Sequence, residues 1–276
     1  MQASDVPGAV AAGIAIAAML GLTADQAIIL QDSNRLVVRL LPCDIVTRIA
    51  HVAHQSGAEF EVELARRLTE TESPVATLDP RVAPQVYIHD RFAVTLWAYY
   101  PPIPPGEVAP AEYAHALARL HAGMRQVGIA APHFTDRVAQ AQWLVASHDH
   151  TPELPDVDRK LLSNTLQSLR QAVVERSTAE QMLHGEPHPG NLLRTKNGLL
   201  FADLETGCRG PVEFDIAHAP QAVSAYYPDA DQQLVRQCRV LMLAMITAWR
   251  WDRDDQLPNG RQLGRTWINE LRGALV

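Results

Sequence analysis

The sequence predicts an α+β protein in two parts, a small mixed β/α N-terminal part and a larger, mostly helical C-terminal part with a short β segment. Two β-branched runs, Leu36–Leu41 and Ile45–Ile49, stand three residues apart and predict a hairpin in the first part. Five prolines between Pro101 and Pro110 interrupt any regular element, so this segment is predicted to be a connector. Helical patterns dominate the chain after it. The predicted boundaries are 1–100, 101–110 and 111–276.

The other elements follow from periodicity. Residues 9–22 are apolar but too short to span a bilayer, and they predict a helix packed on the core. Residues 58–69 have helical spacing, and residues 86–99 return to strand character around a turn at 89–91. After the connector, Ala111–Val127 places its apolar residues on one helical face. Two further helices are predicted near 157–175 and 232–251, on either side of a strand-and-turn section from 182 to 215.

The composition excludes several classes of protein. The chain of 276 residues is 47% hydrophobic and 20% charged, which is typical of a globular protein with ample core material. Its net charge of −7 argues against a general nucleic-acid partner, because phosphate binding needs a basic surface. The three cysteines form no CxxC pair, which favours a reducing compartment. With no basic segment ahead of the apolar run, the sequence predicts a cytoplasmic protein without a membrane partner.

The run His184–Asn191, HGEPHPGN, is the most informative segment. Its glycines and prolines exclude a regular helix, so it predicts a shaped loop with converging polar groups. The apolar runs after it are joined by Asn197-Gly198, a hairpin signal, and this hairpin brings Asn191 close to Asp203. A carboxylate and an amide oxygen suit Mg²⁺ bound together with phosphate oxygens.

Phosphoryl transfer requires metal ligands and an acidic group that orients the attacking hydroxyl. Glu186, five residues before Asn191, is the candidate for that acidic group. The loop resembles the H-G-D-x-H-x-x-N loop of aminoglycoside phosphotransferases and related small-molecule kinases. The matching positions are His184, Gly185, His188 and Asn191, followed by Asp203 as the metal-binding Asp and by residues 210–217 as the next structural turn.

The resemblance implies a two-lobed protein-kinase-like fold and transfer of the γ-phosphoryl group from ATP or GTP to a hydroxyl of a small molecule. It implies Mg²⁺ at Asn191 and Asp203, an anchoring role for His184, and a loop-shaping, phosphate-contacting role for His188. It further implies an acceptor such as an aminoglycoside antibiotic, and relatives with this fold act on macrolides, peptides, sugars, choline-like alcohols and amino-alcohols. An antibiotic acceptor would imply a role in antibiotic resistance. The acidic segments 131–155 and 219–255 would suit a cationic acceptor, although a solvated acidic surface explains the same residues.

The resemblance also implies a nucleotide site in the N-terminal part. Arg48 occupies the place of the basic strand residue that contacts the phosphates, and Glu61 that of its helix partner, with Glu59 and Glu63 as competing choices. No glycine-rich loop is present, so the turn containing Asn34 is the candidate cover for the phosphates. Trp97 and Tyr99 are the candidate contacts for the base; core packing is the alternative for either.

One departure from the family pattern leaves two alternatives open. The family's catalytic Asp is Glu186 here, one methylene longer, and misplacement by about 1 Å can cost roughly 10²-fold in rate. A catalytically inactive kinase-fold scaffold is therefore the main alternative. A more remote one is a Zn²⁺ or Fe²⁺ enzyme that uses the alternating His184, Glu186 and His188.

Overall fold

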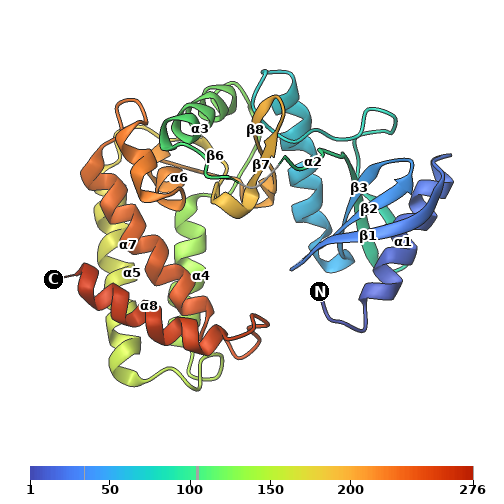
Figure 1. Cartoon of the computed structure of the whole chain (residues 1–276). Helices are drawn as coiled ribbons and strands as arrows, with labels where there is room; N and C mark the ends of the chain where they lie inside the picture. Colours follow the sequence, from blue (N-terminus) through green and yellow to red (C-terminus); the bar gives the residue numbers. More distant parts are fainter. Residues whose placement is uncertain (34, 104–105, 276) are drawn as a thin grey trace. The chain divides into compact units, whose positions relative to one another are not determined.

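The computed structural model describes residues 1–33, 35–103 and 106–275. Two compact units can be distinguished by the contacts within them, and neither is continuous in sequence (Figure 1). Unit 1 comprises Met1–Val108, Arg119–Ile129 and Gly190–Thr206. Unit 2 comprises Ala109–Ala118, Ala130–Pro189 and Gly207–Val276.

A five-stranded antiparallel sheet forms the centre of unit 1. Its strands lie in the order β1-β2-β3-β5-β4. Their bounds are β1 Ala24–Asp32, β2 Leu36–Pro42, β3 Ile45–His51, β4 Tyr87–His89 and β5 Phe92–Ala98. The predicted hairpin is confirmed as β2–β3, in which Val37 lies opposite Arg48 and Arg39 lies opposite Val46. The predicted turn near residue 90 is confirmed between β4 and β5.

The two faces of this sheet differ because side chains alternate along each strand. Val38, Leu40 and Ile49 are fully or almost fully buried on the face that packs against helix α1 (Val6–Met19). Figure 1 shows α1 lying along the sheet. The predicted N-terminal helix is therefore confirmed, although it begins earlier, where Pro7 suits a first helical turn. The opposite face carries Arg39 and Arg48.

Unit 1 also includes α2 (Gln55–Thr69), preceded by the short η1 (Val52–His54), and a hairpin of β7 (Leu192–Thr195) and β8 (Gly198–Phe201). Phe201 donates its N–H to the carbonyl of Pro74 at 2.8 Å and accepts from the N–H of Ala76 at 2.8 Å. The sequence assigned residues 190–206 to the C-terminal part; these backbone bonds are the reason they belong to unit 1. The predicted Asn-Gly turn is confirmed, with Thr195 opposite Gly198.

Unit 2 is mostly helical. Its helices are α4 Phe134–Ala146, α5 Asp156–Arg176, α6 Val212–His218, α7 Gln232–Trp249 and α8 Gly260–Ala274. A two-stranded ladder, β6 (Gln181–Leu183) with β9 (Cys208–Gly210), completes it, together with the short η4 (Gln221–Ala225). Helix α3 (Pro110–Met124) begins in unit 2 and ends in unit 1. The short η2 (Pro189–Asn191) forms the end of the run His184–Asn191, and η3 (Leu204–Thr206) follows β8. The α+β prediction, with a mixed N-terminal part and a mostly helical remainder, is confirmed.

Within the described residues, no helix is long and apolar enough to cross a membrane. Cys43, Cys208 and Cys238 are all free thiols, and the last two are buried. Burial raises the pKa of the Cys208 and Cys238 thiols well above its usual range, so neither is a reactive thiolate.

Candidate active site

An ionic chain in unit 1 joins three of the residues singled out in the sequence. Arg48 on β3 donates one N–H to Oε1 of Glu61 on α2 and another to Oδ1 of Asp203, the latter at 2.6 Å. Glu61 is fully buried and also accepts from the backbone N–H of Leu204 at 3.1 Å. Of the three candidate carboxylates on α2, Glu61 is the one that reaches Arg48, whereas Glu63 pairs with Arg66 and Arg67 at the surface.

A second arginine belongs to the same group of ion pairs, and no sequence pattern linked it to Glu61. Arg35, at the end of the β1–β2 turn, is 5% exposed and donates Nη1–H to Oε2 of Glu61 at 2.9 Å. Its other Nη nitrogen pairs with Glu205. Glu61 is therefore held between two guanidinium groups. The array of two arginines and three carboxylates carries a formal charge of −1, and a bound cation would compensate that charge.

The guanidinium of Arg48 stays charged although it is buried. Burial is the largest single influence on its pKa and opposes ionisation, but the carboxylates of Glu61 and Asp203 outweigh it and raise the pKa of Arg48. Within the described part of the chain, Nε of Arg48 is buried without a hydrogen-bond partner. A buried guanidinium with an unused donor fits a phosphate oxygen, which accepts several charge-assisted hydrogen bonds.

The β7–β8 hairpin sets the positions of Asn191 and Asp203. Ala202 donates its N–H to the carbonyl of Asn191 at 2.9 Å, so the two candidate metal ligands leave adjacent ends of the hairpin. Asp203 has a φ of 68°, a left-handed conformation that Asp and Asn tolerate better than most residues. A carboxylate and an amide are oxygen ligands, and they fit Mg²⁺ shared with phosphate oxygens.

The three remaining nucleotide candidates have different surroundings. Asn34 lies outside the described residues. Trp97 is 5% exposed and donates its indole N–H to Oγ1 of Thr95 at 2.8 Å, so it is largely a core side chain. Tyr99 is half-buried, and the guanidinium of Arg39 lies 3.7 Å from the centre of its ring.

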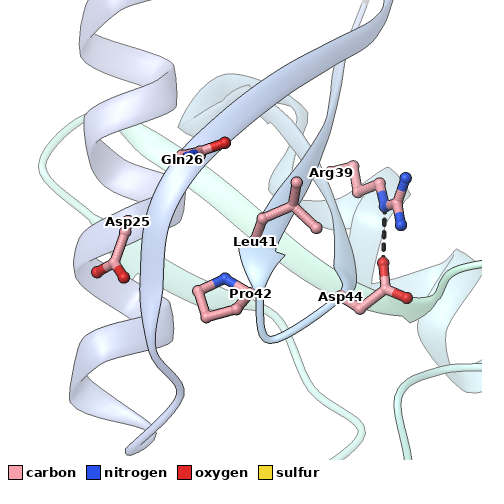
Figure 2. Close-up of a pocket in the computed structure, with 6 residues that line it drawn as sticks. All are labelled: Asp25, Gln26, Arg39, Leu41, Pro42 and Asp44. Carbon is pink, nitrogen blue, oxygen red and sulfur yellow. Dashed lines mark hydrogen bonds and ion pairs between the residues drawn. The ribbon is translucent and has the colours of Figure 1, made fainter.

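An open pocket of about 440 Å³ adjoins this arginine (Figure 2). Residues from β1, β2 and the turn after β2 line it, with the guanidinium of Arg39 bonded to Oδ1 of Asp44 at 2.6 Å. The lining residues are Asp25, Gln26, Arg39, Leu41, Pro42 and Asp44. By register, Arg39 lies on the same face of the sheet as Arg48.

The first part of the catalytic-loop motif belongs to unit 2, where Asp215 tethers it. The Asp215 carboxylate is fully buried and accepts from the N–H of His184 and from that of Gly185, each at 2.8 Å. Gly185 has a φ of 88°, a conformation that glycine adopts at low cost. Tyr113 of α3 adds a hydrogen bond from its hydroxyl to the carbonyl of Pro187. Asp215 therefore tethers the loop through hydrogen bonds to its backbone.

Glu186 is paired with an arginine that the sequence did not single out. Arg137 of α4 donates one N–H to Oε1 of Glu186 and another to the carbonyl of Gly185 at 3.2 Å. Burial is the largest single influence on the pKa of Glu186 and would raise it, but the charge and hydrogen bond of Arg137, aided by His218 and His188, lower it. Glu186 is therefore ionised at neutral pH, as a general base requires.

The structure does not support the remote Zn²⁺ or Fe²⁺ alternative. The N–H of Glu186 donates to Nδ1 of His184 at 3.3 Å, and its side chain turns to Arg137. Within the described residues, the group with the spacing for a metal ion is His150, Asp252 and Asp254, and it does not contain the motif. In a β-strand the side chains of His184, Glu186 and His188 would lie on one face, but in the structure these residues form a loop.

His218 of α6 makes the stability of unit 2 depend on pH. Burial lowers its pKa to about 4, while Nδ1 is bonded to the carbonyl of Phe214 at 2.9 Å. In the unfolded chain its pKa is about 6.5, so between these values the unfolded state binds the extra proton. Stability should therefore fall as pH drops through this interval, by on the order of 3 kcal/mol if His218 acted alone. Urea unfolding at pH 4.5 and 7.5 measures it.

The pH dependence should be smaller in His218→Gln, which cannot titrate, and unchanged in the control His148→Gln, whose side chain is exposed. An equal loss of stability in wild type and His218→Gln would show that His218 is not the group responsible.

Comparison with known proteins agrees with these observations. The model of the phosphotransferase enzyme family (APH) matches residues 21–261. No curated protein sequence matches the chain at a significant level. Among solved structures, amicoumacin kinase hAmiN in complex with AMP-PNP, Ca²⁺ and Ami is similar with a TM-score of 0.73, 12% identity, and coverage of 99% of this chain and 96% of that chain.

Two further structures show the same fold. The GDP complex of aminoglycoside 2'-phosphotransferase-IIIa is similar with a TM-score of 0.73 and 13% identity, covering 97% of this chain and 99% of that chain. A putative fructosamine-3-kinase from Haemophilus somnus has a TM-score of 0.65 and 11% identity, covering 95% and 96%. The family match spans most of the sequence, and it includes both the ionic chain of unit 1 and the tethered loop of unit 2. The chain therefore belongs to the phosphotransferase enzyme family and has its protein-kinase-like fold.

Proposed function

We propose that this enzyme transfers the γ-phosphoryl group of ATP or GTP to a hydroxyl group of a small molecule. The observation that carries the proposal is the ionic chain from Glu61 through Arg48 to Asp203. It joins a phosphate-binding cation, fixed by a buried carboxylate, to a metal-binding carboxylate, and these are the groups that phosphoryl transfer requires of a protein.

In the proposed reaction, Glu186 orients the acceptor hydroxyl and takes its proton. The acceptor oxygen forms a bond to the γ-phosphorus while the bond from that phosphorus to the β,γ-bridging oxygen breaks. The products are a phosphate ester and a nucleoside diphosphate. Arg48 neutralises charge on the phosphates, and Asn191 and Asp203 hold Mg²⁺. The bound Mg²⁺ would neutralise the charge on the β- and γ-phosphate oxygens.

The proposed donor is a nucleoside triphosphate, and the complexes of two similar structures with AMP-PNP and with GDP support a nucleotide at this site. We propose that its phosphates lie at Arg48 and its base toward Tyr99 and Arg39, on the sheet face that α1 leaves uncovered. The guanidinium of Arg39 is a donor that could bond to acceptor atoms of either adenine or guanine. Measuring transfer with ATP and GTP separately decides between them.

The acceptor is a small molecule with a hydroxyl group. The similar structures include kinases named for amicoumacin, aminoglycosides and fructosamine. A cationic acceptor would need unpaired carboxylates, and several acids of unit 2 are already neutralised: Glu153 by Arg261, Asp158 by Arg272 and Asp231 by Arg176. These ion pairs favour the alternative in which the acidic segments 131–155 and 219–255 form a solvated surface and do not bind a cationic acceptor. A cationic antibiotic remains one acceptor to test, and the cytoplasm remains the predicted location.

A screen of nucleotide consumption tests the proposal. Purified enzyme with Mg·ATP or Mg·GTP would be mixed with aminoglycosides, amino alcohols, ketosamines and neutral sugars, and phosphorylated product would be identified by mass spectrometry. At least one acceptor should give product at a rate that depends on Mg²⁺. If none does while nucleotide still binds, the inactive-scaffold alternative gains support. The feature that motivates this alternative is Glu186 in place of the family's catalytic Asp.

Glu186→Gln separates the two alternatives further. The amide keeps the size of the side chain but cannot take a proton, so kcat for transfer to the acceptor should fall by about 10²-fold or more, as for loss of a general base. Steady-state kinetics with the acceptor found in the screen measures it. The exposed Glu180→Gln, on the segment before β6, is the control and should retain activity. Equal rates in Glu186→Gln and wild type would exclude Glu186 as the base.

A further inference from the structure

Glu186 differs from an aspartate by one methylene, and this adds a rotatable bond between backbone and carboxylate. An unrestrained glutamate at the surface samples several rotamers, and few of them aim the carboxylate at one acceptor hydroxyl. The Glu186 side chain is 25% exposed, so packing alone does not select one rotamer. Some other group must fix it if it is to act as a base.

Arg137 has the contacts for this task. One of its terminal nitrogens donates to Oε1 of Glu186, and the other donates to the carbonyl of Gly185 at 3.2 Å. One bond holds the backbone just before Glu186, and the other holds the carboxylate at the end of its side chain. Together they fix the carboxylate relative to the loop. Because the donors of a guanidinium are rigid and planar, the pair also fixes the direction of the carboxylate.

Arg137 is itself held in place. Its side chain is 16% exposed, and its guanidinium lies 5.2 Å from the centre of the Trp249 ring on α7. The first turn of α4, which carries Arg137, is fixed by a capping box between His133 and Asp136. Two helices and the loop therefore determine where the guanidinium lies.

We infer that Arg137 is a positioning residue, which holds the carboxylate of Glu186 in its working orientation. It thereby compensates for the methylene by which Glu186 is longer than an aspartate. This inference rests on the proposed function of Glu186 as the base. Arg137 and the longer side chain thus form one unit, in which neither residue works as well without the other.

The titratable groups around Glu186 come from three elements. Arg137 on α4 and the imidazole of His218 on α6 face it, as does His188 on its own loop. Asp215 on α6 adds a negative charge close to His218 and is held by the loop amides. Removal of Arg137 leaves burial as the main influence on the Glu186 carboxyl, so its pKa should rise in Arg137→Met.

The first test needs no turnover. Full-length wild type, Arg137→Met, Arg137→Lys and the control Gln140→Met, at an exposed position of the same helix, would be labelled with ¹³C at the glutamate carboxyls. Glu186→Gln assigns the signal. The Glu186 signal should titrate at a higher pH in Arg137→Met than in wild type and Gln140→Met, with Arg137→Lys between. Identical titration in all four proteins would overturn the inference.

The second test measures Mg·ATP hydrolysis, in which water takes the place of the acceptor. Arg137→Met should lower kcat by roughly 10-fold to 10²-fold with little change in KM for ATP, because orientation rather than nucleotide binding is lost. Arg137→Lys should recover part of kcat, and the acid limb of the pH profile should move upward in Arg137→Met. A rise in KM with unchanged kcat would assign Arg137 to binding instead.

A double-mutant cycle separates positioning from general damage. Glu186→Asp shortens the side chain away from Arg137, so Arg137→Met should cost less in that background than in wild type. Additive losses would overturn the inference. If wild type hydrolyses no Mg·ATP and phosphorylates no acceptor, the proposed function fails, whereas the ¹³C titration still shows whether Arg137 holds Glu186.

Discussion

Asp203→Ala should abolish Mg²⁺-dependent phosphoryl transfer, with a loss on the order of 10³-fold or more. The substitution removes a candidate metal ligand and the carboxylate that pairs with Arg48 at 2.6 Å. Charge stabilisation by a metal ion and preorganised groups is the main contribution a protein makes to this reaction. Initial rates of nucleotide consumption at several Mg²⁺ concentrations measure the effect.

The backbone of Asp203 calls for two controls. Its φ of 68° disfavours alanine, so some of the loss in Asp203→Ala could come from strain in the turn. Asp203→Asn keeps a side chain that tolerates this conformation and removes the charge, so it should be almost as inactive. Asp90→Ala changes an exposed aspartate with a φ of 51° in the same unit, and should retain activity. Full activity in Asp203→Asn would refute the metal-site assignment.

Local patterns were enough to predict much of the fold. The β-branched runs of β2 and β3, the Asn-Gly turn of the β7–β8 hairpin and the apolar spacing of α5 and α7 all match the structure. Each of these elements has a periodicity or a turn signal that depends only on neighbouring residues. The relation between Asn191 and Asp203 could be predicted for the same reason, because one hairpin places both.

β1 and α8 are among the elements that were not predicted from the sequence. β1 is an edge strand whose apolar residues Ile28, Ile29 and Leu30 are consecutive and exposed, so it shows no alternation. α8 contains three glycines, which lower helix propensity. It forms because Ile268 and Leu271 are buried in the core of unit 2. Sheet pairing therefore decides the structure of β1. In α8 the apolar residues do recur at helical spacing, and burial of that face offsets the cost of its glycines.

The residues that the sequence did not reveal are the partners of the predicted ones. Arg35 lies 26 residues from Glu61, and Arg137 lies 49 residues from Glu186. Neither pair falls on a common helix face or turn, so no spacing rule connects them. A buried carboxylate requires a cation, but the sequence contains many arginines and does not say which one is near.

Glu61→Ala should destabilise unit 1 more than any other single substitution considered. Arg35 and Arg48 have side chains only 6% and 10% exposed, and Glu61 lies between them as their shared partner. Its removal would take the shared, fully buried partner from both guanidinium groups and leave them paired only with Glu205 and Asp203. Breaking a buried ion pair from one side typically costs about 3–5 kcal/mol. Urea unfolding would measure the change in the free energy of unfolding, and hydrogen exchange in β3 and α2 would localise it.

The same helix supplies the matched control. Glu63 also pairs with two arginines, but all three side chains are about 36–41% exposed, so Glu63→Ala should cost no more than about 1 kcal/mol. Adding Arg35→Met to Glu61→Ala should restore part of the stability, because Arg35 then no longer lies buried near Arg48 without the carboxylate that they shared. Equal costs for Glu61→Ala and Glu63→Ala would show that the buried Arg35–Glu61–Arg48 ion pairs do not hold the Arg48 side chain in place. Its position would then have to depend on its ion pair with Asp203.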